Sequence, residues 1–291
     1  MLSSHPARRL YRVPLSSPGQ SLELGRRVLV MGILNLTPDS FAERGRHGSV
    51  DDAVESALQL ERDGADILDI GGESTRPGAE PVTAEVERSR VLPVLEALAG
   101  RLRIPISIDT YKAEVAGPAL AAGAAMVNDI SGLRFDESLG PVVAAAGAPI
   151  ILMHTRGGPS TMHDRASFSN VIGEVIRELA DSIGAATSAG IPRDRIVIDP
   201  GLGFAKRSGH SYGVLAHLAE MGALDRPVLV GPSRKSFMRE ALGEQQAAER
   251  DWGTAAAVTA AVLAGAHIVR VHAVAEMVQV VRVAEEIRRH G

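Results

Sequence analysis

The stretch Val28-Leu-Val-Met-Gly-Ile-Leu-Asn-Leu36 decides the fold class. It is an apolar run with one glycine and, near its end, one asparagine, and the turn signal Thr37-Pro38-Asp39 follows it. Such a run is typical of a strand that is buried on both faces of a parallel sheet. An open, doubly wound sheet would place a GxGxxG turn after this first strand, and none is present there. The sequence therefore favours a closed α/β barrel over an open nucleotide-binding sheet.

Seven further apolar runs follow, and segments of helical period lie between them. The expected strands are Val28–Leu36, Asp66–Gly71, Ile104–Asp109, Ala125–Ile130, Pro149–His154, Ile196–Asp199, Val228–Gly231 and Ile268–His272. The expected helices lie at 51–63, 84–99, 112–122, 138–146, 169–189, 211–221, 252–265 and 274–289. Eight alternating units predict an α/β fold of the (β/α)8, or TIM barrel, type.

The segment before the first barrel strand predicts a short N-terminal β-hairpin. Ser21–Leu24 and Arg27–Val30 alternate around Gly25, and we expect them to pair and close the barrel bottom. We expect residues 1–20 to form an N-terminal arm, which could be flexible, and residues 21–291 to form one barrel domain. The arm contains arginine and serine but no acid, which faintly resembles a transit peptide. A loosely packed arm of a cytoplasmic protein is the simpler interpretation.

Composition excludes several classes of function. The chain has 291 residues and a net charge of −4, which gives no reason to expect nucleic acid or an anionic membrane as a partner. It has no cysteine, so disulfides, thiolate catalysis and cysteine-ligated zinc are excluded. No apolar stretch approaches the roughly 20 residues of a membrane span.

Polar residues gather at the ends of all eight expected strands. They are Asn35, Glu73 to Arg76, Asp109, Asn128, Asp129, His154, Asp199, Ser233 to Lys235, Arg270 and His272. Any one of them could simply cap the next helix. The carboxyl ends of barrel strands converge on one funnel, however, and this is where barrel enzymes carry their active sites. We therefore expect a single polar site. The histidines at 163, 210, 217 and 267 match no such position, and we expect them on the surface or on helices.

The chemistry of this set fits a flat heterocycle that carries an anionic leaving group. Two aspartates, an asparagine and a lysine can accept from ring N–H groups and donate to ring N and C=O groups. The arginines at 76 and 270 and His272 form a cationic rim suited to phosphate. Asn35 offers an oxygen to a Mg²⁺ ion held mainly by phosphate and water. No Ser–His–Asp system and no zinc-ligand spacing is present. The set predicts electrostatic catalysis.

Seven ordered motifs resemble the signatures of the dihydropteroate synthase family, which are pterin-binding enzymes. They are Met31-Gly-Ile-Leu-Asn-Leu-Thr-Pro-Asp-Ser-Phe41, Asp69-Ile-Gly-Gly-Glu-Ser-Thr-Arg-Pro-Gly78, Ser107-Ile-Asp-Thr110, Val127-Asn-Asp-Ile130, Asp199-Pro-Gly-Leu-Gly-Phe204, Gly231-Pro-Ser-Arg-Lys-Ser236 and Arg270-Val-His272. The resemblance runs from about residue 21 to 289, and it implies the barrel that the strand pattern predicts.

The resemblance also implies a role for individual residues. The catalytic residues would be Asp109, Lys235 and Arg270. The pterin ring would bind to Asp109, Asn128, Met153, Asp199, Gly231, Lys235 and Arg270, and the diphosphate to Asn35, Arg76, Arg270 and His272, with Asn35 acting through Mg²⁺. The p-aminobenzoate would bind to Phe41, Thr75, Pro77, Phe204, Lys235 and Ser236. Plain core positions for Met153 and Phe204, and a simple first helical turn at Ser236, remain open.

The implied reaction joins (7,8-dihydropterin-6-yl)methyl diphosphate to 4-aminobenzoate in folate biosynthesis, by an SN1-like alkyl transfer. Sulfonamides are the implied inhibitors. A homodimer is implied too, through outer helices near the C-terminus. A methyltetrahydrofolate–corrinoid methyltransferase and a non-catalytic pterin-binding homologue are the alternatives. Two departures from the family pattern bear on the site: Glu43-Arg44 in the first loop, and Ala273 where the family has an aspartate.

Overall fold

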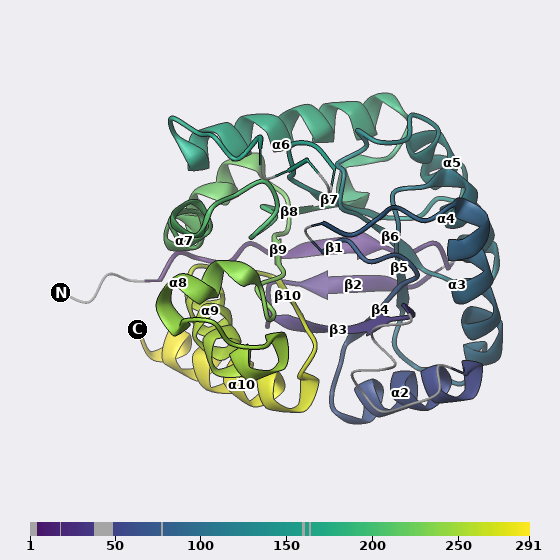
Figure 1. Cartoon of the computed structure of the whole chain (residues 1–291), viewed down its shortest axis with the longest axis horizontal. Coiled ribbons are helices and arrows are strands. Elements are labelled where there is room, and N and C mark those ends of the chain that lie inside the picture. The colour runs from purple at the N-terminus through teal and green to yellow at the C-terminus, as the bar shows by residue number, and fades with distance from the viewer. Residues whose placement is uncertain (1–4, 18, 38–48, 77, 159–160, 163) are drawn as a thin grey trace.

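Eight parallel strands form a nearly closed barrel in the computed structural model, which describes all residues except 1–4, 18, 38–48, 77, 159–160 and 163 (Figure 1). The strands are β3 (Leu29–Asn35), β4 (Ile67–Gly71), β5 (Ile106–Asp109), β6 (Met126–Asp129), β7 (Ile150–Met153), β8 (Ile196–Asp199), β9 (Leu229–Val230) and β10 (Ile268–Val271). Their order around the sheet is β8-β7-β6-β5-β4-β3-β10-β9. A parallel bridge between Ile198 and Val228 joins β8 to the start of β9 and closes the ring. The predicted barrel is confirmed.

Helices surround the barrel because each strand buries apolar side chains on its outer face as well as inside (Figure 1). They are α2 (Val50–Arg62), α3 (Ala84–Leu98), α4 (Ala113–Ala121), α5 (Leu139–Ala145), α6 (Val171–Ser188), α7 (Ser208–Ala216), α8 (Arg239–Leu242), α9 (Asp251–Leu263) and α10 (Val274–His290). Short 3-10 helices cover Arg193–Arg195, Leu218–Leu224, Ser236–Met238 and Ala247–Arg250. No helix in the described part of the chain is long and apolar enough to cross a membrane.

Local capping sets the helix starts. Ser49 and Asp52 form a reciprocal capping box at the start of α2. Helix α7 begins at Ser208, before the predicted start at 211, because the Arg207 N–H donates to His210 Nδ1 (3.3 Å) at its first turn. The helix was predicted from the spacing of its apolar residues, and that spacing carries no information on such a cap.

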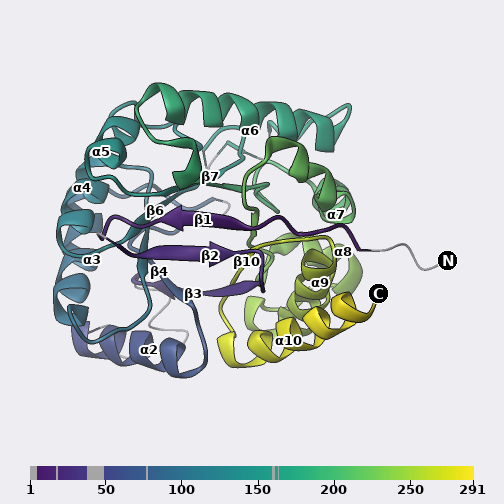
Figure 2. The same ribbon diagram turned by 180° about the vertical axis from the view of Figure 1, so that it is seen from behind.

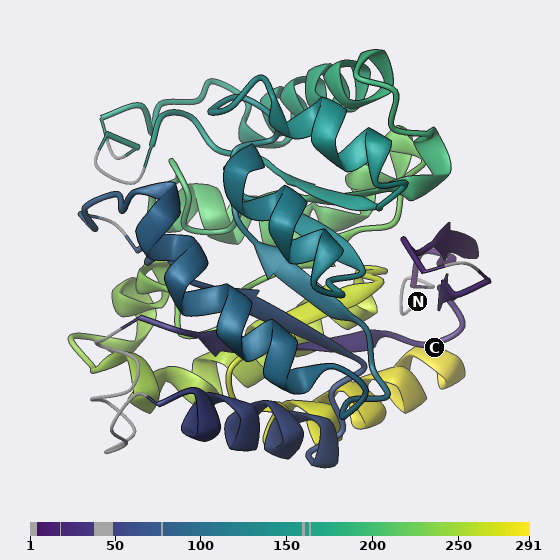
Figure 3. The same ribbon diagram turned by 90° about the vertical axis from the view of Figure 1, so that its right-hand side faces the viewer.

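The bottom of the barrel is closed by a hairpin whose first strand differs from the prediction. Strand β2 (Ser21–Leu24) pairs antiparallel with β1 (Tyr11–Pro14), and not with Arg27–Val30. The predicted partner was wrong because residues from Leu29 onward belong to barrel strand β3. The hairpin crosses the ring of strands at the end away from the strand carboxyl ends (Figures 2 and 3). The division into an arm over 1–20 and a barrel domain stays a prediction, although β1 lies within that arm.

The hairpin completes an apolar core at the barrel bottom. The inward side chains of the lower strand halves meet the hairpin in one buried cluster of Val13, Leu15, Leu22, Leu24, Leu29, Met31, Ile67, Ala125, Met126, Ile151, Val197, Leu229 and Ile268. The upper halves of the same strands point polar side chains inward. The strand period of two thus separates a dry lower half from a polar upper half.

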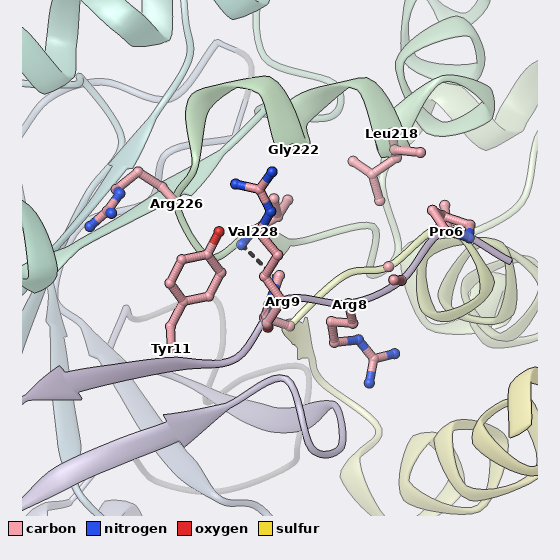
Figure 4. A pocket seen from close by; sticks show the side chains of 13 residues that line it. Pro6, Arg8, Arg9, Tyr11, Leu218, Gly222, Arg226 and Val228 are labelled. Atoms are coloured by element: carbon pink, nitrogen blue, oxygen red, sulfur yellow. Dashed lines mark hydrogen bonds between the residues drawn. The ribbon is translucent and has the colours of Figure 1, made fainter.

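A small cavity of about 190 Å³ lies beside the hairpin, between residues 6–11 and the 3-10 helix Leu218–Leu224 (Figure 4). His267 lines it but is buried, so the expected surface or helix position was wrong. Its Nδ1 accepts from the Val228 N–H (3.1 Å), and burial lowers its pKa to about 4. Arg9 at this cavity pairs with Asp225 (2.8 Å).

Candidate active site

A cavity of about 1000 Å³ opens at the carboxyl ends of the barrel strands and collects most of the predicted site residues. Those that line it are Asn35, Thr75, Arg76, Asp109, Phe204, Gly231, Lys235, Ser236, Arg270 and His272. Asn128, Met153 and Asp199 are buried at the ends of adjoining strands. Phe41 and Pro77 lie outside the described residues. The strand ends therefore converge as predicted, and the roles of the individual residues stay predictions.

Asp109 lies in a buried network of charged side chains. Sheet register places Asn128 next to Asp109 across β5 and β6. Arg270 Nη2 donates to Asp109 Oδ2 (2.6 Å), and Arg270 Nε donates to Asp69 Oδ2 (2.5 Å). Asn128 Nδ2 donates to the same Asp69 oxygen (3.0 Å). The other oxygens of both carboxylates, Oδ1 of Asp69 and of Asp109, are buried without a hydrogen bond to any described residue.

An unpaired buried carboxylate oxygen costs free energy until a donor reaches it. Because Asp109 also lines the cavity, its free Oδ1 is an acceptor available to a ligand N–H group. Burial raises the pKa of Asp109, and Asp69 raises it further, while Arg270 opposes both. Arg270 therefore favours the charged form of Asp109.

Asp199 and Lys235 form the other side of the predicted pterin cradle, the set of Asp109, Asn128, Asp199 and Lys235. The Gly201 N–H donates to Asp199 Oδ1 (2.7 Å), and a Cβ at Gly231 would lie 3.9 Å from Asp199 Oδ2. Glycine at 231 thus keeps the space in front of this carboxylate open. Lys235 Nζ lies 4.0 Å from the centroid of the Phe204 ring, a cation–π contact.

Burial disfavours the charged forms of Asp199 and Lys235 and so shifts the pKa of each towards 7. It raises the pKa of Asp199 to about 6, against the Gly201 hydrogen bond and the charge of Lys235. It lowers the pKa of Lys235 to about 8, with Arg270 acting in the same direction and the two aspartates against it. Perturbed groups at strand ends around one cavity are typical of a functional site.

The residues predicted to contact the diphosphate include three at or just after strand ends. Asn35 ends β3, Arg76 follows β4, and His272 follows β10. His272 Nδ1 lies 2.9 Å from Ser233 Oγ, and the His272 N–H donates to the same oxygen (3.2 Å). Ser233 therefore orients His272 in this chain, where position 273 carries alanine. Ala273 is the N-cap of α10 and supplies no side-chain hydrogen bond to it.

The side of the cavity where the sequence predicts p-aminobenzoate to bind combines apolar and polar positions. Phe204 packs with Met153, Met162 and Ile130 in a small buried cluster, and Thr75 lines the cavity nearby in the loop after β4. Ser236 is exposed and begins the 3-10 helix Ser236–Met238, which α8 continues. Glu43 and Arg44 lie outside the described residues, so the departure in the first loop stays a sequence observation.

The loop after β4, residues 72–83, is held by a buried ionic cluster that the sequence analysis missed. Tyr111 OH donates to Glu73 Oε1 (2.8 Å), and Lys112 Nζ donates to Glu73 Oε2 (2.5 Å) and to Glu87 Oε2 (2.7 Å). Lys112 also donates to the Val82 carbonyl at the far end of the loop (2.7 Å). These contacts fix both ends of the segment that carries Thr75 and Arg76.

Two further residues near the site were also missed. Asp69 was quoted in a motif without a role, yet it is fully buried and bonded to Arg270. Lys206 is 3% exposed and contacts His154 (2.7 Å) behind the Phe204 loop. The composition carried a signal for Lys206. Only three of the 31 lysine and arginine residues are lysine, and all three lie close to this cavity.

The described residues include no group of three or more His, Cys, Asp or Glu side chains placed to hold a metal ion. The cavity offers Asn35 as an oxygen ligand instead. Such a donor set fits Mg²⁺, which commonly keeps water and substrate phosphates as most of its ligands.

Known proteins resemble this chain in both sequence and fold. The family model described as "Pterin binding enzyme" matches residues 31–272. The dihydropteroate synthase of Synechocystis is 46% identical over 280 residues, 96% of this chain and 97% of that protein, and that of Escherichia coli K12 is 44% identical over 271 residues, 93% and 95%. The solved Xanthomonas albilineans dihydropteroate synthase with 4-aminobenzoic acid is 42% identical, with a TM-score of 0.88 over 96% of this chain and 99% of that one. A Yersinia pestis dihydropteroate synthase with a sulfonamide drug is 39% identical, with a TM-score of 0.90 and coverages of 96% and 99%.

Barrel, cavity and family match together define a pterin-binding barrel enzyme. The matches to these two synthases span nearly their whole length. The chain belongs to the dihydropteroate synthase family, which are transferases of folate biosynthesis. These relatives do not support the methyltransferase or the non-catalytic homologue considered from the sequence.

Proposed function

We propose that this chain joins (7,8-dihydropterin-6-yl)methyl diphosphate to 4-aminobenzoate, with release of diphosphate, in the cavity at the barrel mouth. The observation that carries the proposal is the free Oδ1 of Asp109, a buried acceptor beside Asn128 in a cavity that also holds Lys235. A pterin ring presents several N–H donors and acceptors along its edge. It would satisfy these groups together, which a purely apolar ring could not do.

The reaction begins with loss of the leaving group. The bond between the pterin methylene carbon and the diphosphate oxygen breaks, and the electron pair leaves with diphosphate. Arg76, Arg270 and His272 attract the departing anion, and Asp109 stabilises the positive charge that develops on the pterin-methyl group. Charges fixed in advance within a buried site stabilise such a transition state without reorganisation. A normal secondary deuterium isotope effect at this methylene is expected, and a value near unity would contradict the SN1-like step.

Mg²⁺, when bound to the diphosphate, supplies additional positive charge to the leaving group. Asn35 would contribute the protein oxygen, and Arg76 and His272 would contact the remaining phosphate oxygens. Titration with EDTA followed by Mg²⁺ tests this proposal: diphosphate release should fall and then recover. An Asn35→Ala variant should need more Mg²⁺ for half-maximal rate.

The aniline nitrogen of 4-aminobenzoate then forms the new C–N bond and loses a proton to solvent or diphosphate. Phe204 and Thr75 would lie along its ring, with Phe41 and Pro77 from the two loops, and Ser236 would donate to its carboxylate. Sulfonamides resemble 4-aminobenzoate in shape, so they should compete for this part of the cavity. Competitive inhibition against 4-aminobenzoate, but not against the pterin substrate, is the expected result.

One assay separates the proposal from its alternatives. Purified chain is incubated with the pterin diphosphate, with or without 4-aminobenzoate, and diphosphate and dihydropteroate are measured. Equal amounts of both products, dependent on both substrates, are expected. Pterin binding without product would indicate the non-catalytic homologue, and methyl transfer from methyltetrahydrofolate to a corrinoid would indicate the methyltransferase.

A homodimer through the C-terminal helices is part of the proposal. Exposed apolar side chains support it: Trp252 on α9 is 88% exposed, and Val283 and Ile287 on α10 are 62% and 49% exposed. Burying such side chains favours association. Light scattering after size exclusion should give twice the 30.6 kDa chain mass. The Val283→Glu variant should give the mass of a single chain. A cytoplasmic location stays a prediction.

A further inference from the structure

Lys206 is a buried lysine whose ammonium folds back onto its own loop. Its Nζ lies within hydrogen-bond distance of the carbonyl oxygens of Gly201 (3.1 Å) and Phe204 (3.1 Å) and of His154 Nδ1 (2.7 Å). The His154 carbonyl lies at 3.5 Å. Only 3% of the residue is exposed. Burying a cation is costly unless each N–H finds an acceptor, and here the loop carbonyls and His154 supply the acceptors.

His154 extends these contacts to helix α6. Its Nδ1 faces the ammonium and must accept, so its Nε2–H donates to Glu178 Oε2 (3.1 Å). Burial, with the nearby Lys206 charge, lowers the pKa of His154 to about 4, which fits a neutral ring. Arg156 donates to Glu178 and to Glu174 (2.7 Å) on the same helix. A continuous chain of hydrogen bonds thus ties residues 200–206, the Lys206 loop, to α6.

The Lys206 loop has a backbone that needs such support. Gly201, Gly203 and Ala205 all adopt positive φ (67°, 76° and 47°), and for Ala205 this is the sparsely populated left-handed region. A Cβ at Gly203 would lie 3.5 Å from the Lys235 side chain. Phe204 presents its ring to Lys235 Nζ from the same loop. The shape of this loop therefore sets where Phe204 lies under Lys235.

The choice of lysine at 206 is itself informative, because this chain otherwise uses arginine for nearly every cation. An ammonium is compact and directs its three N–H groups tetrahedrally, whereas a guanidinium is a wide planar fork. Carbonyls on several sides of one small buried pocket suit only the ammonium. The same argument applies to Lys112, which donates to two carboxylates and a carbonyl.

We propose that Lys206 is a positioning residue for the aromatic-acid subsite: its ammonium holds the Lys206 loop in the shape that places the Phe204 ring beneath Lys235. Lys206 does not touch the reacting atoms. Its contribution to 4-aminobenzoate binding rests on the proposed function, whereas its effect on the shape of the loop does not. Loss of the ammonium should therefore loosen the loop and weaken 4-aminobenzoate binding, while Asp109 and Asn128 on β5 and β6 keep their geometry and continue to hold the pterin ring.

The absence of cysteine allows the ammonium to be removed and restored at one position. The Lys206→Cys chain is alkylated while unfolded and then refolded. Treatment with 2-bromoethylamine gives a side chain of lysine length that ends in an ammonium, and treatment with 1-bromopropane gives the same length ending in a methyl group. Arg62→Cys, on the exposed face of α2, receives both treatments as the control.

The expected result is a KM for 4-aminobenzoate raised about 10- to 100-fold in the propyl form and largely restored in the aminoethyl form. The KM for the pterin diphosphate should stay within about 3-fold of wild type in both forms. Amide exchange of residues 201–206, measured without substrate, should be about 10-fold faster in the propyl form.

Three outcomes would overturn the proposal: equal loop exchange in the two alkylated forms, an unchanged KM for 4-aminobenzoate, or a parallel rise in both KM values. If the propyl form does not refold, Lys206→Met takes its place. Its amide exchange in the loop should also be faster than in wild type. Failure of the proposed function would look different, because wild type itself would then release no diphosphate while the exchange result still tested the loop.

Discussion

At the scale of single residues, the site depends on the Asp109 carboxylate, which has one oxygen in a hydrogen bond and one available to a ligand. Asp109 accepts from Arg270 with one oxygen, and its other oxygen is buried without a hydrogen bond from any residue that the structure describes. Asp109→Asn keeps the shape of the side chain but removes the charge opposite the developing cation. Turnover should fall at least about 10-fold, since this charge acts in the transition state. Steady-state kcat with both substrates saturating measures this, and Asp51→Asn on the exposed start of α2 is the control. A near-normal kcat for Asp109→Asn would remove Asp109 from the mechanism.

The shifted groups on the other side of the cradle predict a narrow pH range. Asp199 must be a carboxylate to accept from the ring, and its pKa is raised to about 6. Lys235 must keep its proton to donate, and its pKa is lowered to about 8. We therefore expect kcat/KM for the pterin substrate to rise as pH increases through about 6 and to fall through about 8. Asp109 must also be charged, and burial raises its pKa to about 7, so the acid limb should reflect both carboxylates. Asp199→Asn should leave a limb near 7 that belongs to Asp109, and a limb that stays near 6 would belong to the substrate.

Residue identities were predictable where a strand ended in a polar side chain, because the barrel brings all strand ends together. Asp109 and Asp199 were found in this way. Asp69 was not, since it lies in the middle of β4 and reads as a buried strand residue. Lys206 was not found either, because nothing local indicates that a lysine after Phe204 folds inward. The acceptors for both come from distant parts of the chain, which local patterns do not specify.

At the scale of elements, the loop over residues 72–83 depends on Lys112. The side chains of Glu73 and Glu87 are 3% and 1% exposed, and Lys112 pairs with both. Lys112→Met would leave two buried carboxylates without their cation, and removing one partner of a buried pair costs about 3–5 kcal/mol. The urea midpoint should fall accordingly. Because the loop carries Arg76, the KM for the pterin diphosphate should also rise, about 10-fold.

A matched control for this change is Arg289→Met, which breaks an exposed ion pair with Glu286 on α10. Exposed pairs contribute little, so neither the urea midpoint nor either KM should move. Equal effects of the two substitutions would mean that burial does not determine the strength of the Lys112 cluster. A stability loss in Lys112→Met with an unchanged pterin KM would separate the cluster from the loop's role in the site.

Most elements were predictable, and the hairpin is the most instructive failure. Strand positions followed from apolar runs, and the observed bounds lie within two residues of those expected. The hairpin partner was wrong because alternation identifies a strand but not the strand that it pairs with. Arg27–Val30 and Tyr11–Pro14 both alternate, and only the demand that Leu29 enter the barrel decides between them. Pairing is a property of the whole fold, so a local period cannot supply it.

At the scale of the whole molecule, the barrel places stability and chemistry at opposite ends. The lower core, closed by β1 and β2, is apolar, and the charged network around Asp69 and Arg270 lies above it. Residues at the strand carboxyl ends generally carry catalysis in such barrels, while the opposite face serves stability. A dry lower core also supports the buried charges above, because it fixes the strands from which they project. Substitutions at the two ends should therefore have separable effects.

Leu24 on β2 tests this separation directly. It is 1% exposed within the lower core, and truncating a buried leucine to alanine costs about 2–5 kcal/mol. Leu24→Ala should lower the urea midpoint accordingly, while both KM values and kcat, measured well below that midpoint, stay within about 2-fold of wild type because distant sites act independently. Leu10→Ala, in the same segment but with Leu10 65% exposed, should change neither. If Leu24→Ala altered either KM at low urea, the hairpin would be coupled to the catalytic end through the strands, and the barrel would not divide into a stabilising half and a reactive half.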